Sequence, residues 1–414
     1  KRCSRLPSQG AIAGAASMPE LWATANKKFQ EATFDRGVPT ALRRRVVGEA
    51  LGHVVAATLF MVYIESRGAP VLLSAAMVPC AIVLAAIHGR LWCNLHHNRR
   101  PGTPVIRHRI GGANRLTLTR GLLIGLVAGF LFSGPLGQYP HAAAWAWWPG
   151  VLYLWAALLD GFDGYWARRY GAPTCLGQKL DLHTDALGML VACTVAVGTQ
   201  RLPPYYLAAG MAFYVYRFGL WYRRRRGYRN RPTGPRTFAR LVAGAQMGFV
   251  GIAMLPLFAY NVIQVLAPLF LLPLFAGFVW DWMIVRGGVS EAAERRCQRV
   301  LGIIVAKAPP LLRVGLLFTG GFLIRGMTVA PPLPTALLIS LGLMVISGLA
   351  GRTAALLLSL ALAFQATATA PTPLLMATLA TAVVLAMAGT GDVSLWRPED
   401  RFIFRQSAGR LSCG

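Results

Sequence analysis

Apolar stretches close to 18–20 residues long recur along this chain and constrain its fold more than any other feature. A helix needs about 20 apolar residues to cross the hydrocarbon core of a bilayer. Hydrophobic residues make up 55% of the chain and the mean hydropathy is +0.49, which excludes a soluble globular protein. We therefore expect an all-α polytopic membrane protein with about twelve transmembrane helices. The predicted spans are residues 46–65, 70–88, 116–136, 147–165, 181–198, 204–222, 237–258, 265–285, 311–326, 332–349, 353–370 and 373–388.

Basic residues outnumber acidic residues by 42 to 15, giving a formal net charge of +27. If the N-terminus is cytoplasmic, most of this charge falls in inner segments such as 43–45, 90–120, 223–226 and 295–299, as the positive-inside rule requires. This pattern predicts a multi-pass protein of a bacterial-type inner (plasma) membrane with both termini cytoplasmic. The charge is spread over many loops and no nucleic-acid-binding fold is recognisable, so anionic membrane lipids are favoured over nucleic acid as partners.

Four aspartates stand against this basic background, in the order D-x2-D-G-x2-A-R-x8-G-x3-D-x3-D. An ionisable group at membrane depth costs about 2.5 to 3.5 kcal/mol and is by default a candidate functional group. Asp160 and Asp163 are spaced i,i+3, and Asp181 and Asp185 are spaced i,i+4, so each pair lies on one face of a helix. Pro173 lies between the pairs and prevents one continuous helix. A helical hairpin would then bring the two pairs side by side.

Four carboxylates in a small volume need cations, because like charges a few ångströms apart do not all stay ionised. Ligands that are all oxygen favour hard ions such as Mg²⁺, Mn²⁺ or Ca²⁺ over zinc. The small residues Gly164, Ala167 and Gly177 allow a second helix or a bulky phosphate to approach the backbone closely. Arg168 adds a fixed cation. Together these residues predict a site for a pyrophosphate-bearing substrate.

The acidic motif resembles the signature of the CDP-alcohol phosphotransferase family of integral membrane enzymes and matches it at every signature position. The matching residues are Asp160, Asp163, Gly164, Ala167, Arg168, Gly177, Asp181 and Asp185. Upstream, the sequence ANRLTLTRG resembles the family's Asn-x-Leu-Thr element, with its asparagine at Asn114 and its threonine at Thr117. The resemblance covers roughly residues 114–286 and implies a six-helix core. It also implies transfer of a phosphoalcohol group from a CDP-linked donor to a second alcohol, with release of CMP, in phospholipid biosynthesis.

The resemblance assigns roles to these residues. Asp160, Asp163 and Asp181 are expected to hold two divalent ions, Mg²⁺ or Mn²⁺, while Asp185 completes the carboxylate cluster and acts as the general base. The residues expected at the cytidine diphosphate are Asn114, Thr117, Asp160, Gly164, Ala167, Arg168 and Gly177. CDP-diacylglycerol is the expected donor, since a site at the inner membrane surface suits a lipid already embedded there. No Ser-His or Cys-His arrangement accompanies the motif, which favours direct transfer over a covalent enzyme intermediate.

Basic residues follow the fourth core span, in the region where relatives bind a polar acceptor. Arg217 lies inside that span, and Arg236 with Thr237 resembles the family's basic-Thr element, although Pro235 departs from the usual form. This concentration of arginine side chains favours a phosphorylated acceptor such as glycerol phosphate or inositol phosphate. Positive-inside charge is the alternative explanation for most of this run, with Arg217 as the best exception.

The chain is expected to contain three segments: residues 1–109 with a tail, two transmembrane helices and a basic cytoplasmic loop, residues 110–286 with the phosphotransferase core, and residues 287–414 with a four-helix bundle and a cytoplasmic tail. The sequence GTGDVSLWRPEDR at 389–401 resembles the terminal motif of the DoxX-like family of small four-helix membrane proteins. No catalytic residue is carried over from that resemblance. Arg313, near the start of a predicted span, is expected to snorkel to the headgroups.

Two other functions remain open. A divalent-cation transporter would also hold acids in the membrane, but it should carry further acids at mid-membrane, and only Glu65 and Asp281 lie near span ends. A noncatalytic membrane scaffold would depend on the C-terminal bundle, and the intact signature argues against it. Relatives commonly pair through their core helices, so a homodimer is a further expectation.

Overall fold

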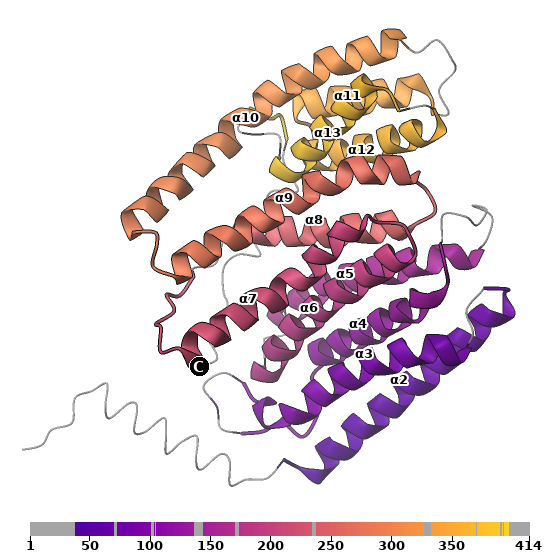
Figure 1. Cartoon of the computed structure of the whole chain (residues 1–414), viewed down its shortest axis with the longest axis vertical. Helices are drawn as coiled ribbons and strands as arrows, with labels where there is room; N and C mark the ends of the chain where they lie inside the picture. Colours follow the sequence, from indigo (N-terminus) through magenta and orange to yellow (C-terminus); the bar gives the residue numbers. More distant parts are fainter. Residues whose placement is uncertain are drawn as a thin grey trace, which may run out of the picture.

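The computed structural model describes residues 38–69, 73–100, 103, 105–135, 144–169, 174–233, 237–326, 333–369, 371–389, 391 and 393–396. Side chains at 163–169, 237–238 and 305–306 also lie outside this description. Within it the chain forms twelve α-helices and no β-strand, with one isolated bridge between Leu349 and Trp396 (Figure 1).

Each of the twelve predicted spans overlaps one helix, which confirms the all-α polytopic fold class. The helices are α2 (Thr40–Ser66), α3 (Leu73–Cys93), α4 (Gly112–Ala128), α5 (Trp148–Arg169), α6 (Cys175–Gly198), α7 (Leu207–Arg225), α8 (Thr237–Met254), α9 (Tyr260–Val285), α10 (Glu291–Gly326), α11 (Thr335–Ser347), α12 (Gly351–Ala368) and α13 (Pro373–Ala388). Seven helical segments are long and apolar enough to cross a membrane, and three shorter apolar helices fall within α8, α11 and α13.

Helix α10 begins much earlier than the sequence predicts. The predicted span starts at residue 311, directly after Pro309 and Pro310, but the helix runs from Glu291 to Gly326 through both prolines. Glu291 and Glu294 lie in its first turn, where carboxylates stabilise the positive end of the helix dipole. Prolines are tolerated inside transmembrane helices because neighbouring groups satisfy the freed carbonyls.

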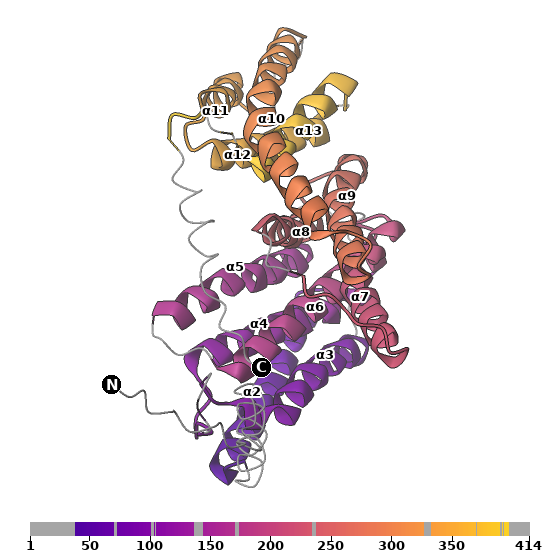
Figure 2. The same cartoon turned by 90° about the vertical axis from the view of Figure 1, so that its left-hand side faces the viewer.

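The helices follow one another through the molecule largely in chain order, from α2 at one end to α10–α13 at the other (Figure 1 and Figure 2). Helix α4 packs against α3, α5 and α6, and it is the most buried of the candidate spans. A polar side chain on α4 that faces its neighbours is therefore shielded from lipid.

Arg313 on α10 does not snorkel. Its side chain is buried, and its guanidinium donates to the carbonyls of Ile346 at 3.2 Å and Val393 at 2.6 Å and to Ser394 Oγ at 2.7 Å. The end of α11 and the segment after α13 offer carbonyl acceptors inside the bundle, so the guanidinium is satisfied there and does not need the headgroup region. These hydrogen bonds hold Val393 and Ser394, which belong to the predicted terminal motif, against α10.

Candidate active site

The first turn of α4 and the N-terminal cap of α6 lie side by side. Thr174 caps α6 by accepting a hydrogen bond from the Gly177 backbone N–H at 3.0 Å. The Asn114 side-chain amide on α4 donates to Thr174 Oγ1 at 3.1 Å. The Asn-x-Leu-Thr element thus joins the start of α4 to the cap of α6.

Gly177 is required by the closeness of α4 and α6. A Cβ atom at this position would lie 2.5 Å from Asn114 Oδ1 and 3.2 Å from Thr174 Oγ1, which leaves no room for a side chain. The sequence predicted Gly177 at the substrate diphosphate, and the structure supplies an additional packing reason for the glycine.

Three of the four predicted aspartates converge. Asp160 comes from the middle of α5, while Asp181 and Asp185 come from successive turns of α6. One carboxylate oxygen from each residue lies within 4.8 Å of the others. The side chains are 36%, 36% and 38% exposed, so the cluster is accessible from one side.

The structure describes only some of the remaining predicted site residues. Thr117 is buried on α4 and donates to the Ala113 carbonyl at 3.1 Å, whereas Arg217 is exposed on α7. Thr237 is the first residue of α8. The side chains of Asp163, Gly164, Ala167, Arg168 and Thr237, and the whole of Arg236, lie outside the described residues.

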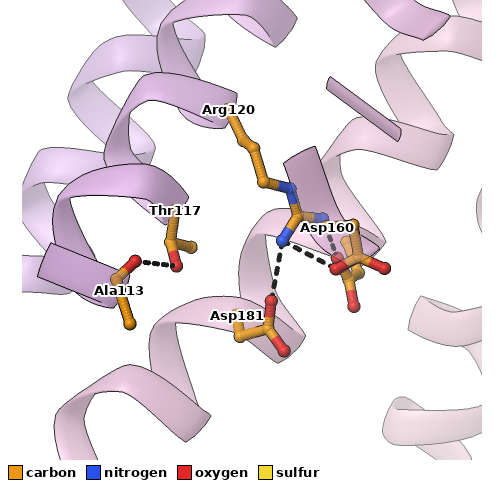
Figure 3. Close-up of polar contacts among 6 residues, drawn as sticks. Ala113, Thr117, Arg120, Asp160 and Asp181 are labelled. Atoms are coloured by element: carbon orange, nitrogen blue, oxygen red, sulfur yellow. Dashed lines mark hydrogen bonds and ion pairs between the residues drawn. The ribbon is translucent and has the colours of Figure 1, made fainter. Parts of the chain in front are cut away.

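Arg120 on α4 is a site residue that sequence reasoning missed. Its side chain is only 1% exposed, and Nη1 lies 2.8 Å from both Asp160 Oδ1 and Asp181 Oδ1 (Figure 3). Nη2 binds Asp185. Sequence reasoning counts Arg120 among inner-side basic residues. The position of Arg120 in the sequence could have indicated its role. It lies three residues after Thr117 and therefore shares that residue's helix face.

The arrangement combines a buried guanidinium with three partly exposed carboxylates. When all four groups are ionised, three carboxylates and one guanidinium leave a net charge of minus two. Arg120 already directs one oxygen of each carboxylate inward. Oxygens that share one Mg²⁺ or Mn²⁺ are at most about 4 to 5 Å apart, since each bond is roughly 2.1 to 2.4 Å long. The carboxylate spacing and the oxygen-only donor set therefore fit a hard divalent cation.

Residues 112–280 match the model of the CDP-alcohol phosphatidyltransferase family. The central segment is therefore similar to this family. The match begins at the first residue of α4 and ends inside α9, so α4, α5 and α6 of the CDP-alcohol phosphatidyltransferase segment supply every residue of the carboxylate cluster. This similarity supports a membrane transferase that acts on phosphatidyl groups. Neither the curated proteins nor the solved structures compared with the chain include a match.

Proposed function

We propose that this protein transfers a phosphatidyl group from CDP-diacylglycerol to a hydroxyl of a polar acceptor and releases CMP. The observation that carries the proposal is the convergence of Asp160, Asp181 and Asp185 around buried Arg120, inside the segment that matches the family. This convergence would provide an accessible cation site, as binding a diphosphate requires.

Asp160 and Asp181, together with Asp163, would hold two divalent cations, Mg²⁺ or Mn²⁺. When bound, such ions neutralise the diphosphate and stabilise the attacking and leaving oxygens at phosphorus. Arg120 keeps the carboxylates oriented from the buried side, while the partly exposed side chains stay accessible to the cations. Asn114, Thr117, Gly164, Ala167, Arg168 and Gly177 are the proposed surroundings of the cytidine diphosphate.

Asp185 is the proposed general base. It lies one turn beyond Asp181, close to the cluster, and is fixed by the Arg120 guanidinium. The acceptor oxygen forms a bond to the β-phosphorus while the bond from that phosphorus to the CMP oxygen breaks. Asp185 takes the proton of the acceptor hydroxyl, and CMP leaves with the electrons of the broken bond.

The acceptor and the cellular setting also belong to the proposal. Arg217, Arg236 and Thr237 are proposed to bind a polar, phosphorylated acceptor. Positive-inside charge supports a cytoplasmic site and cytoplasmic termini in a bacterial-type inner membrane. Residues 1–109 and 287–414 would flank the phosphotransferase core, the latter as a DoxX-like bundle, and homodimer formation through core helices is part of this proposal.

A transfer assay tests the function. The purified full chain is reconstituted with radiolabelled CDP-diacylglycerol, a panel of alcohols and Mg²⁺ or Mn²⁺, and CMP release is measured. We expect release that depends on both the metal and one acceptor. Folded protein that releases no CMP with any acceptor would contradict the proposal, and metal uptake without CMP would support a transporter instead.

A further inference from the structure

A large cavity separates the matched core from the C-terminal helices. It has a volume of about 590 Å³, and it is lined by α8 and α9 on one side and by α12 and α13 on the other. These helices lie side by side in both views (Figure 1 and Figure 2). Its walls are largely apolar, as Phe249, Ile252, Phe270, Leu360 and Val383 illustrate. The volume falls in the roughly 300–1,000 Å³ range of ligand sites.

Two arginines line the cavity, Arg240 on the first turn of α8 and Arg352 on the first turn of α12. The opposite ends of these helices are also neighbours, because the Ala259 backbone N–H, just after α8, donates to Thr367 Oγ1 near the end of α12 at 3.0 Å. Helices α8 and α12 therefore run in the same direction. Both guanidinium groups consequently belong to the same end of the cavity.

The cavity is distinct from the carboxylate cluster. None of the residues Arg120, Asp160, Asp181 and Asp185 lines it. The face of α8 that turns away from it packs on α5, where a Cβ at Gly251 would lie 2.6 Å from Leu154 Cδ2. Helix α8 thus stands between the cavity and α5.

We propose that this cavity binds an acyl chain of an anionic glycerophospholipid, with the lipid phosphate at the arginine end. An apolar volume between membrane-spanning helices suits a hydrocarbon chain, and guanidinium groups are the preferred partners of phosphate. Arg352 also donates to the carbonyls of Met387 at 2.8 Å and Ala388 at 3.1 Å, which hold its charge at the end of α13. Arg240 supplies the second charge. The bound lipid joins the C-terminal helices to the core.

The open glycines of α8 allow the cavity to be filled. Gly244 and Gly248 both line it, and a Cβ at either position would meet nothing within 4 Å. Gly248→Leu should occupy the space of the acyl chain while improving helix propensity. Gly277→Leu on α9 is the matched control, since that glycine also has open space but does not line the cavity.

Native mass spectrometry of the delipidated full chain, titrated with dioleoylphosphatidylglycerol or dioleoylphosphatidylcholine, tests the proposal. We expect one tightly bound phosphatidylglycerol per chain and roughly tenfold weaker binding of phosphatidylcholine. Gly248→Leu should abolish this binding, Arg240→Gln should remove the preference for the anionic lipid, and Gly277→Leu should behave as the wild type. Gly244→Leu replaces Gly248→Leu if the latter does not fold.

Equal binding of both lipids by the wild type would overturn the proposal, as would wild-type binding by a folded cavity-filling variant. The readout is lipid mass. It is therefore independent of CMP release, and failure of either proposal leaves the other standing.

Discussion

The Arg120 guanidinium lies 2.8 Å from an Asp181 carboxylate oxygen, although the two residues are 61 positions apart and belong to different helices. Arg120 is almost completely buried, whereas Asp181 is more than one-third exposed. The ion pair therefore connects a buried side chain on α4 to a partly exposed side chain on α6. It fixes the positions of α4 and α6 relative to each other through the same carboxylates that are proposed to hold the metal.

Arg120→Met should destabilise the protein by about 2 kcal/mol, because it leaves three clustered carboxylates without their buried cation. Breaking a buried pair costs about 3 to 5 kcal/mol, and the solvent exposure of the aspartates reduces that figure. Arg115→Met is the control on the same helix, since Arg115 is 60% exposed and pairs with Glu49. Denaturant unfolding should show a loss below about 1 kcal/mol for the control. Equal losses in both variants would contradict the account.

Gly177→Ala should cost about 1 to 3 kcal/mol, since the new methyl group overlaps Asn114 Oδ1. In an Asn114→Ala background the same change should cost clearly less, because the obstructing amide is gone. A double-mutant cycle of unfolding free energies measures this coupling. Gly89→Ala on α3, where a Cβ meets nothing within 4 Å, serves as the control and should be neutral or stabilising. Additive losses at 177 and 114 would rule out the proposed steric contact.

Asp185→Asn should reduce the turnover number by about 100-fold or more, since the isosteric amide does not accept the acceptor proton. Binding of the CDP-linked donor should be retained, because the shape of the side chain is unchanged. Parallel measurements of CMP release and donor binding separate these effects. Full turnover in this variant would refute the role of Asp185 as general base.

His97 couples the basic loop after α3 to the start of α6, with its Nε2 atom 2.6 Å from Lys179 Nζ. Burial, followed by the neighbouring His96, Lys179 and Arg99, lowers the pKa of His97 from 6.5 to about 4. The unfolded chain therefore binds more protons between these values, and stability should fall as the pH drops from about 6.5 toward 4. His97→Gln should flatten this part of the stability profile in thermal unfolding scans. If the His97→Gln variant kept the pH dependence of stability of the wild type, His97 would not be the source of that dependence.

The apolar runs of the sequence predict all twelve described α-helices, because each span needs its own apolar run to cross a bilayer. The spacing of Asp160, Asp181 and Asp185 likewise predicts which helix faces carry acids. Contacts between side chains that are far apart in the sequence cannot be predicted from these patterns. Arg120 looks like any inner-side arginine until α4 is packed against α5 and α6, and Arg313 looks like a snorkelling residue until the segment after α13 folds against it.

The start of α10 could not be predicted from the sequence, for a different reason. Tandem prolines ordinarily mark a helix end, and the local pattern at Pro309 and Pro310 gives no sign that the helix continues through them. The polar first half of α10, which begins at Glu291, also lacks the uniform hydropathy that marks the other spans. Its helical state depends on context that the apolar pattern does not encode.

The central claim is that acids from α5 and α6 hold one set of divalent cations. Titration with Mn²⁺ followed by electron paramagnetic resonance tests it directly on the wild type, Asp160→Asn and Asp181→Asn. We predict that each variant binds Mn²⁺ at least about tenfold more weakly and loses CMP release in parallel, because each removes a charged ligand. Wild-type Mn²⁺ affinity in either folded variant would contradict the claim that the two helices share the metal site.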